Sequence, residues 1–166
     1  LNETQLREVI TKILTLAAQQ GIGEAPVEQA EPEEDEALAA LDRGDYAAAE
    51  ASYRALLERK PNDVYGKLGL AQVQLLIRTN GLDAAAIMKV AIERPDDIEL
   101  QMQCADVEIL GGYLEPGFKR LLALITILSG DEQKQVKERL LELFALVDPA
   151  DPRVIKARAQ LANALF

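Results

Sequence analysis

Histidine and tryptophan are absent from this chain of 166 residues, and cysteine occurs only once, as Cys104. Without histidine, the sequence lacks the commonest general base and a common metal ligand. A serine or cysteine nucleophile would also lack the imidazole that usually activates it. A single cysteine excludes a disulfide within the chain, which favours a reducing, cytoplasmic setting. We therefore expect a protein that is not an enzyme and that uses no cofactor or metal.

Aromatic residues, long apolar runs and positive charge are also scarce. Aromatics make up 4% of the chain, and the leucine-, alanine- and glutamate-rich remainder favours an all-α protein over a sheet. No apolar run approaches the roughly 20 residues that cross a membrane, and no signal peptide is visible. Lysine and arginine number 18 against 28 acids, a net charge of −10. This balance argues against nucleic acid as a partner.

Much of the negative charge lies in one stretch that contains no base. Its acids are Glu24, Glu28, Glu31, Glu33, Glu34, Asp35 and Glu36. Setting them aside leaves 21 acids against 18 bases, so the rest of the chain is nearly balanced. The alternative to a solvated linker is an acidic metal-binding loop, but the sequence EPEEDE lacks the spacing of an EF-hand. We predict an acidic linker over residues 21–32.

The rest of the chain repeats itself with a period of 34 residues. Ala37, Ala71 and Ala105 are separated by that interval, as are Pro61 and Pro95. This period is typical of tetratricopeptide repeats, in which small residues let two helices approach and proline ends the second helix. The best single copy is GDYAAAEASYRALLERKPND, which begins at position 44. The sequence predicts an all-α, tetratricopeptide-like array of antiparallel helix hairpins over residues 33–166, with a capping helix pair at its C-terminal end.

An amphipathic helix is expected at the start of the chain, over residues 1–20. Asn2 and Gln5 have the spacing of a capping box, and one apolar stripe follows, made of Leu6, Val9, Ile10, Ile13, Leu14 and Ala17. The helix is either packed in the ordinary way or separated from a partner that lies upstream. In the second case it could mediate self-association.

If the array binds proteins, we expect the binding groove along the first helix of each hairpin. The repeat register places seven residues in it: Tyr65, Leu68, Gln72, Leu75, Met102, Asp106 and Ile109. Such a groove suits an apolar segment or an amphipathic helix, although some of these side chains could instead pack against neighbouring helices. Repeats that clamp a C-terminal carboxylate carry basic residues at set positions. Those positions hold Glu34, Leu38, Gly69, Glu99 and Gln103 here, so no basic clamp is expected.

Cys104 lies beside Ala105 in the third repeat, at a position expected to be apolar. It is either a small buried residue or an exposed thiol that captures a partner through a mixed disulfide.

The order of these parts resembles the C-terminal region of the bacterial thioredoxin-like co-chaperones called chaperedoxins. NETQLREVITKIL resembles the closing helix of a thioredoxin domain, the acidic stretch resembles the hinge, and LLELFALVDPADPRVIKARAQLANALF resembles the terminal helix pair. The resemblance implies a stress-response chaperone that binds non-native client proteins and the chaperonin. The chain contains no CxxC motif, so redox chemistry is not implied for it. A dedicated scaffold with one defined partner is the alternative.

Overall fold

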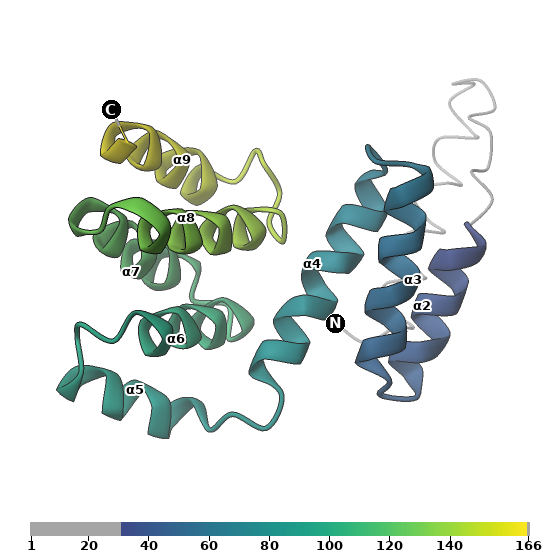
Figure 1. The fold of residues 1–166 in the computed structure, drawn as a ribbon, viewed down its shortest axis with the longest axis horizontal. Coiled ribbons are helices and arrows are strands. Elements are labelled where there is room, and N and C mark those ends of the chain that lie inside the picture. The colour runs from purple at the N-terminus through teal and green to yellow at the C-terminus, as the bar shows by residue number, and fades with distance from the viewer. Residues whose placement is uncertain (1–30, 166) are drawn as a thin grey trace, which may run out of the picture. The chain divides into compact units, whose positions relative to one another are not determined.

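The computed structural model describes residues 31–165, and this part of the chain contains helices and no strand (Figure 1). The chain divides into two units, Leu1–Glu31 and Pro32–Phe166. The predicted N-terminal helix and most of the predicted linker lie outside the described residues. The helices of the second unit are α2 (Pro32–Asp42), α3 (Tyr46–Arg59), α4 (Val64–Thr79), α5 (Ala84–Glu93), α6 (Ile98–Leu110), α7 (Leu114–Ile127), α8 (Gly130–Phe144) and α9 (Pro152–Leu165). The predicted all-α repeat array is confirmed.

Aspartates begin four successive helices, because each carboxylate accepts a hydrogen bond from a backbone N–H three residues further on. The pairs are Asp45 with Ala48 (3.0 Å), Asp63 with Gly66 (2.7 Å), Asp83 with Ala86 (3.1 Å) and Asp97 with Leu100 (3.0 Å). An N-cap of this kind stabilises a helix by about 1 kcal/mol. These aspartates therefore mark where α3 to α6 begin, and Asp63 and Asp97 lie at equivalent positions of successive repeats, 34 residues apart.

Two glycines two repeat periods apart turn the chain between paired helices. Gly44 and Gly112 have φ values of 71° and 84°, a left-handed conformation that side-chain-bearing residues rarely adopt. Gly44 joins α2 to α3, and Gly112 joins α6 to α7, and in each case the two helices pack on one another.

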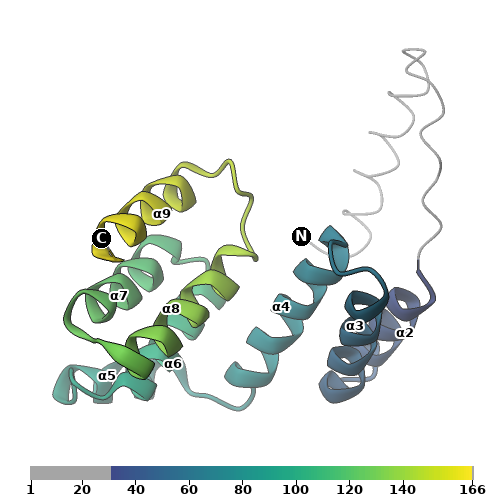
Figure 2. The ribbon, with the colours of Figure 1, turned by 45° about the horizontal axis from the view of Figure 1, so that its top comes forward.

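The second hairpin of the array differs from the first and third. Helix α4 packs on α3 and α6, whereas α5 packs on α6, and α4 and α5 share no comparable contact (Figures 1 and 2). The turn glycine Gly81 arrives late in this repeat, so α4 has 16 residues and α5 has only 10. Of the α5 residues, only Ala91 is buried.

Two hydrophobic clusters hold the second unit together, and α4 contributes to both. The smaller cluster joins α2, α3 and α4 through Ala37, Ala40, Ala49, Tyr53 and Val73. The larger one includes Leu75 of α4, runs through α6, α7, α8 and α9, and contains the edge-on ring pair Phe118 and Phe144. Because Val73 and Leu75 point to different clusters, α4 connects the two.

No helix among residues 31–165 is both long enough and apolar enough to cross a membrane.

Gly69 allows α4 to approach α3 closely, because the ring of the buried Tyr53 occupies the space that a side chain at position 69 would need. A Cβ added there would overlap the outer ring atoms of Tyr53. Overlap of this kind costs about 1–3 kcal/mol, which exceeds the gain of about 1 kcal/mol that alanine brings to a helix interior.

We therefore predict that Gly69→Ala lowers the free energy of unfolding by up to about 2 kcal/mol, the difference between these two quantities, measured by urea denaturation. In a Tyr53→Leu background the outer ring atoms are gone, and the same change should be neutral or stabilising. The same loss in both backgrounds would show that the ring is not the cause.

Candidate functional site

The predicted binding residues lie on α4 and α6, the first helices of the second and third hairpins. On α4, Tyr65 and Gln72 are exposed, Leu68 is half-buried, and Leu75 is buried in the larger cluster. The exposed fraction of Tyr65 is 63%. The half-buried Leu76 continues the row at helical spacing. We call Tyr65, Leu68, Gln72 and Leu76 the α4 stripe.

On α6 the structure places the corresponding residues in the interior. Met102 and Ile109 belong to the larger hydrophobic cluster, and the Asp106 side chain is completely buried. The structure therefore does not bring all seven predicted residues together on one open surface. Among them, only the α4 residues Tyr65, Leu68 and Gln72 remain accessible to a partner.

Asp106 is held by two arginines from the neighbouring first helices. Arg78 of α4 donates from Nε to Oδ2 at 2.9 Å and from Nη2 to Oδ1 at 3.2 Å. Arg139 of α8 donates from Nη1 to Oδ2 at 2.5 Å. Arg78 also reaches Glu142 on α8, with Nη1 3.1 Å from Oε2. The network joins α4, α6 and α8 and balances two positive charges against two negative ones.

The repeat register did not identify Arg78, Arg139 or Glu142. A signal was present, because Asp106 occupies a position that holds an apolar leucine, Leu140, one repeat later. A buried carboxylate requires charged or hydrogen-bonding partners. Arg78 lies six residues after the equivalent position on α4 and Arg139 lies one residue before the equivalent position on α8, so no single offset in the repeat register identifies both.

A second group of polar side chains attaches α5 to α6 and α7. Arg120 of α7 donates to Glu108 at 2.7 and 3.0 Å and to Gln101 at 2.6 Å. Gln101 in turn donates to the carbonyl oxygens of Ala91 and Arg94 at 3.1 and 3.2 Å. The hydrogen bonds to Glu108 raise the pKa of Arg120 further above its ordinary value. These bonds attach α5 to the array through its C-terminal end.

The chemistry of the described part gives no sign of a reactive centre. Residues 31–165 contain no cluster of acids and cysteine able to hold a metal ion. Every buried side-chain nitrogen and oxygen in this part has a hydrogen-bond partner. Of the positions expected for a carboxylate clamp, Gly69 is covered by Tyr53 and none carries a base.

Cys104 is completely buried, and its thiol lies 3.9 Å from the carbonyl oxygen of Ile87. Burial raises the pKa of this thiol, which lowers the fraction of the reactive thiolate. The structure therefore supports the small buried residue and not an exposed capturing thiol.

We predict that iodoacetamide modifies Cys104 at least about tenfold more slowly in the native protein than in urea, because reaction requires local opening. Since the chain has no other cysteine, the mass of the intact protein reports the modification directly. Equal rates in the two states would contradict the buried position.

Removing the Asp106 charge should destabilise the array. Breaking a buried ion pair costs about 3–5 kcal/mol, because the remaining charges lose their partner. We predict that Asp106→Asn lowers the free energy of unfolding by about 3 kcal/mol in urea denaturation. Glu142→Gln is the control, since the Glu142 side chain is 42% exposed and a pair of this kind contributes at most about 1 kcal/mol. Equal effects of the two substitutions would argue against a central role for Asp106.

Comparison with known proteins agrees with the helical repeat. Proteins of Mycobacterium bovis and of two strains of Mycobacterium tuberculosis, each named only as uncharacterized, are 38% identical to the chain over 165 residues. The match covers 98% of this chain but 54% of each relative, so the chain spans about half of their length. None of these relatives is named as a thioredoxin-like chaperone. No solved structure matches.

A family profile described as tetratricopeptide repeat matches residues 77–166, more than half of the chain. The chain therefore belongs to the tetratricopeptide repeat family.

Proposed function

We propose that this chain is a non-catalytic protein-binding module whose partner packs on the α4 stripe. Proteins with tetratricopeptide repeats are in general protein–protein interaction modules. The single observation that carries the proposed location is the exposure of an apolar edge on an otherwise well-packed helix. Tyr65 is 63% exposed, and Val64 beside it is 73% exposed. Tyrosine at such a position offers a large contact area and a hydroxyl group, which is why it is enriched in interfaces.

The length of the stripe indicates the kind of partner. From Tyr65 to Leu76 it extends over three helical turns, or about 16 Å. A partner helix with apolar residues at i, i+3 and i+7 would match it. Gln72, in the middle of the row, provides hydrogen-bonding groups that help to fix the register of the partner.

As the more specific form of this proposal, the module belongs to a cytoplasmic thioredoxin-like chaperone and binds non-native clients, the chaperonin, or both. The resemblance of the sequence to chaperedoxins supports it. The relatives extend well beyond the matched region, which leaves room in them for another domain. Further exposed apolar side chains, such as Ile92 at 82% and Leu110 at 51%, fit weak contacts with many clients.

A scaffold with one defined partner is the second candidate, and the continuous α4 stripe is the observation that favours it. A single row of three turns is a complete docking site for one amphipathic helix. Self-association through the N-terminal helix is a form of this candidate, but that helix lies outside the described residues.

We predict that the chain suppresses the aggregation of chemically unfolded citrate synthase, measured by light scattering, and that Tyr65→Asp weakens this effect severalfold. The aspartate would place a solvated charge in an apolar contact. Ile127→Asp is the matched control, because Ile127 is at least as exposed as Tyr65, at 74% against 63%, but lies on α7. Far-ultraviolet circular dichroism should show unchanged helicity in both variants.

Equal losses in the two variants would contradict the α4 stripe as the binding surface. If the wild-type chain does not suppress aggregation but captures one stoichiometric protein from a lysate, and Tyr65→Asp abolishes that capture, the module is a dedicated scaffold.

A further inference from the structure

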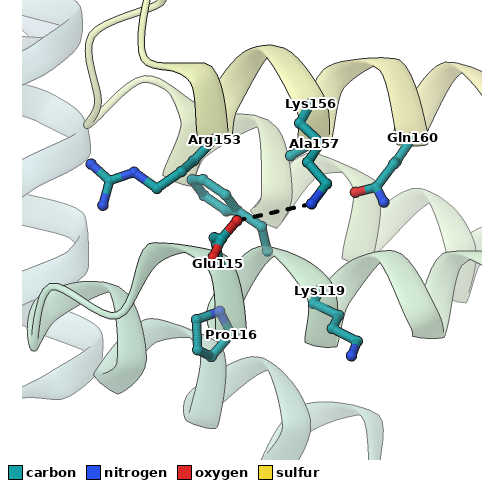
Figure 3. A pocket seen from close by; sticks show the side chains of 8 residues that line it. Glu115, Pro116, Lys119, Arg153, Lys156, Ala157 and Gln160 are labelled. Carbon is teal, nitrogen blue, oxygen red and sulfur yellow. Dashed lines mark ion pairs between the residues drawn. The ribbon is translucent and has the colours of Figure 1, made fainter.

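A second candidate surface lies between α7 and α9, the second helices of the last two hairpins, which pack against each other. A hollow of about 650 Å³ opens between them. Figure 3 shows Glu115 of α7 and Lys156 of α9 pointing toward one another, with Gln160 of α9 farther along, while Lys119 lines the α7 edge of the hollow with its side chain directed away from α9. Pro116, Phe118 and Ala157 provide apolar walls. This surface is separate from the α4 stripe, which lies on a first helix.

The hollow continues along the two helices. A second hollow of about 380 Å³ also has Lys119 and Gln160 in its lining, so the two form one groove. Beyond the shared residues its lining is mostly apolar and includes Leu122, Ala123 and Ala164. From Arg153 to Ala164 the groove follows α9 for about 16 Å, the length of roughly five residues of extended peptide.

The two ends of the groove differ in charge. Three cations and one carboxylate line the larger hollow, from Lys119, Arg153, Lys156 and Glu115, and Lys119 also borders the smaller one, in a chain whose net charge is −10. Arg153 is already engaged, since its Nη2 lies 2.6 Å from Oδ2 of Asp151. Lys119 and Lys156 have weaker ion pairs than Arg153, or none. Lys156 lies 4.0 Å from Glu115, with both side chains mostly exposed, and Lys119 makes no ion pair with any residue in the described range.

We propose that this groove binds an acidic peptide segment of a partner protein. The carboxylates of the peptide lie against Lys119 and Lys156. An apolar side chain that follows these carboxylates in the peptide lies on Leu122, Ala123 and Ala164. The charge pattern decides the class of occupant, because a basic or neutral segment gains nothing from two lysines that have no strong partner of their own. The sequence of charge and apolar contact along the groove also fixes the direction of the peptide. This proposal is independent of the proposed client binding on α4.

The test uses the full chain and a fluorescein-labelled peptide, Glu-Glu-Asp-Glu-Ala-Leu, which has the required order of acids and apolar side chain. The control peptide is Gln-Gln-Asn-Gln-Ala-Leu. Fluorescence anisotropy should show that the acidic peptide binds about tenfold more tightly, as expected for several weak ion pairs acting together. The difference should shrink as salt increases from 50 mM to 500 mM, because salt screens exposed charges.

Two double variants with the same change in net charge locate the site. Lys119→Glu with Lys156→Glu should weaken binding of the acidic peptide by about tenfold or more. Lys89→Glu with Lys134→Glu alters two exposed lysines on α5 and α8, outside the groove, and should leave binding within about twofold. Circular dichroism confirms that both double variants are folded.

Equal binding of the two peptides, or equal losses in the two double variants, would overturn the proposal. A salt-sensitive dimer of the chain in sedimentation, dissolved by Lys119→Glu with Lys156→Glu, would assign the groove to a second copy and overturn the assignment to a partner protein. The Tyr65→Asp variant tests client binding on the α4 stripe, and the peptide measurements test the groove between α7 and α9. Either proposal can therefore be overturned without affecting the other.

Discussion

One buried carboxylate determines how successive first helices are joined in this array. Asp106 is completely buried, and its oxygens accept hydrogen bonds from Arg78 of α4 and Arg139 of α8. A buried charge is strongly unfavourable unless its partners replace the lost water. The network is satisfied only when both neighbouring helices place an arginine at Asp106. A shift of either helix by one turn would leave the carboxylate without one of its partners, so the network selects a single register.

This junction explains how the array tolerates an irregular second hairpin. In a regular repeat the two helices of each hairpin pack together, but α4 packs on α3 and α6 and not on α5. Arg78 and Leu75, three residues apart on α4, attach this helix to α6 through one ionic and one apolar contact. Helix α5 is attached separately, through Gln101 and the carbonyl oxygens near its C-terminal end. The long α4 and the short α5 are the result of one late turn at Gly81.

Much of the fold could be predicted because its determinants are local. The interval of 34 residues places buried alanines at Ala37, Ala71 and Ala105, and the capping aspartates mark where helices begin. The candidate site was less predictable, because exposure depends on neighbouring helices that a local register does not describe. Leu68 and Met102 hold equivalent register positions. Met102 is nevertheless completely buried, whereas part of the Leu68 side chain remains exposed to solvent.

The Asp106 network also limits what the two faces of the array could bind. Arg78 of α4 and Arg139 of α8 are bases that would suit a ligand carboxylate, but both already bind a buried one. An incoming carboxylate would have to compete for these arginines with Asp106. Because Asp106 is buried, water could not replace the hydrogen bonds that it would lose. The first-helix face therefore favours an apolar partner. Acidic segments are favoured on the α7–α9 side, where Lys119 and Lys156 are free of such a competitor. A protein that offered both features to the two surfaces would bind more tightly than either contact alone allows, because the second contact forms within a complex that already exists.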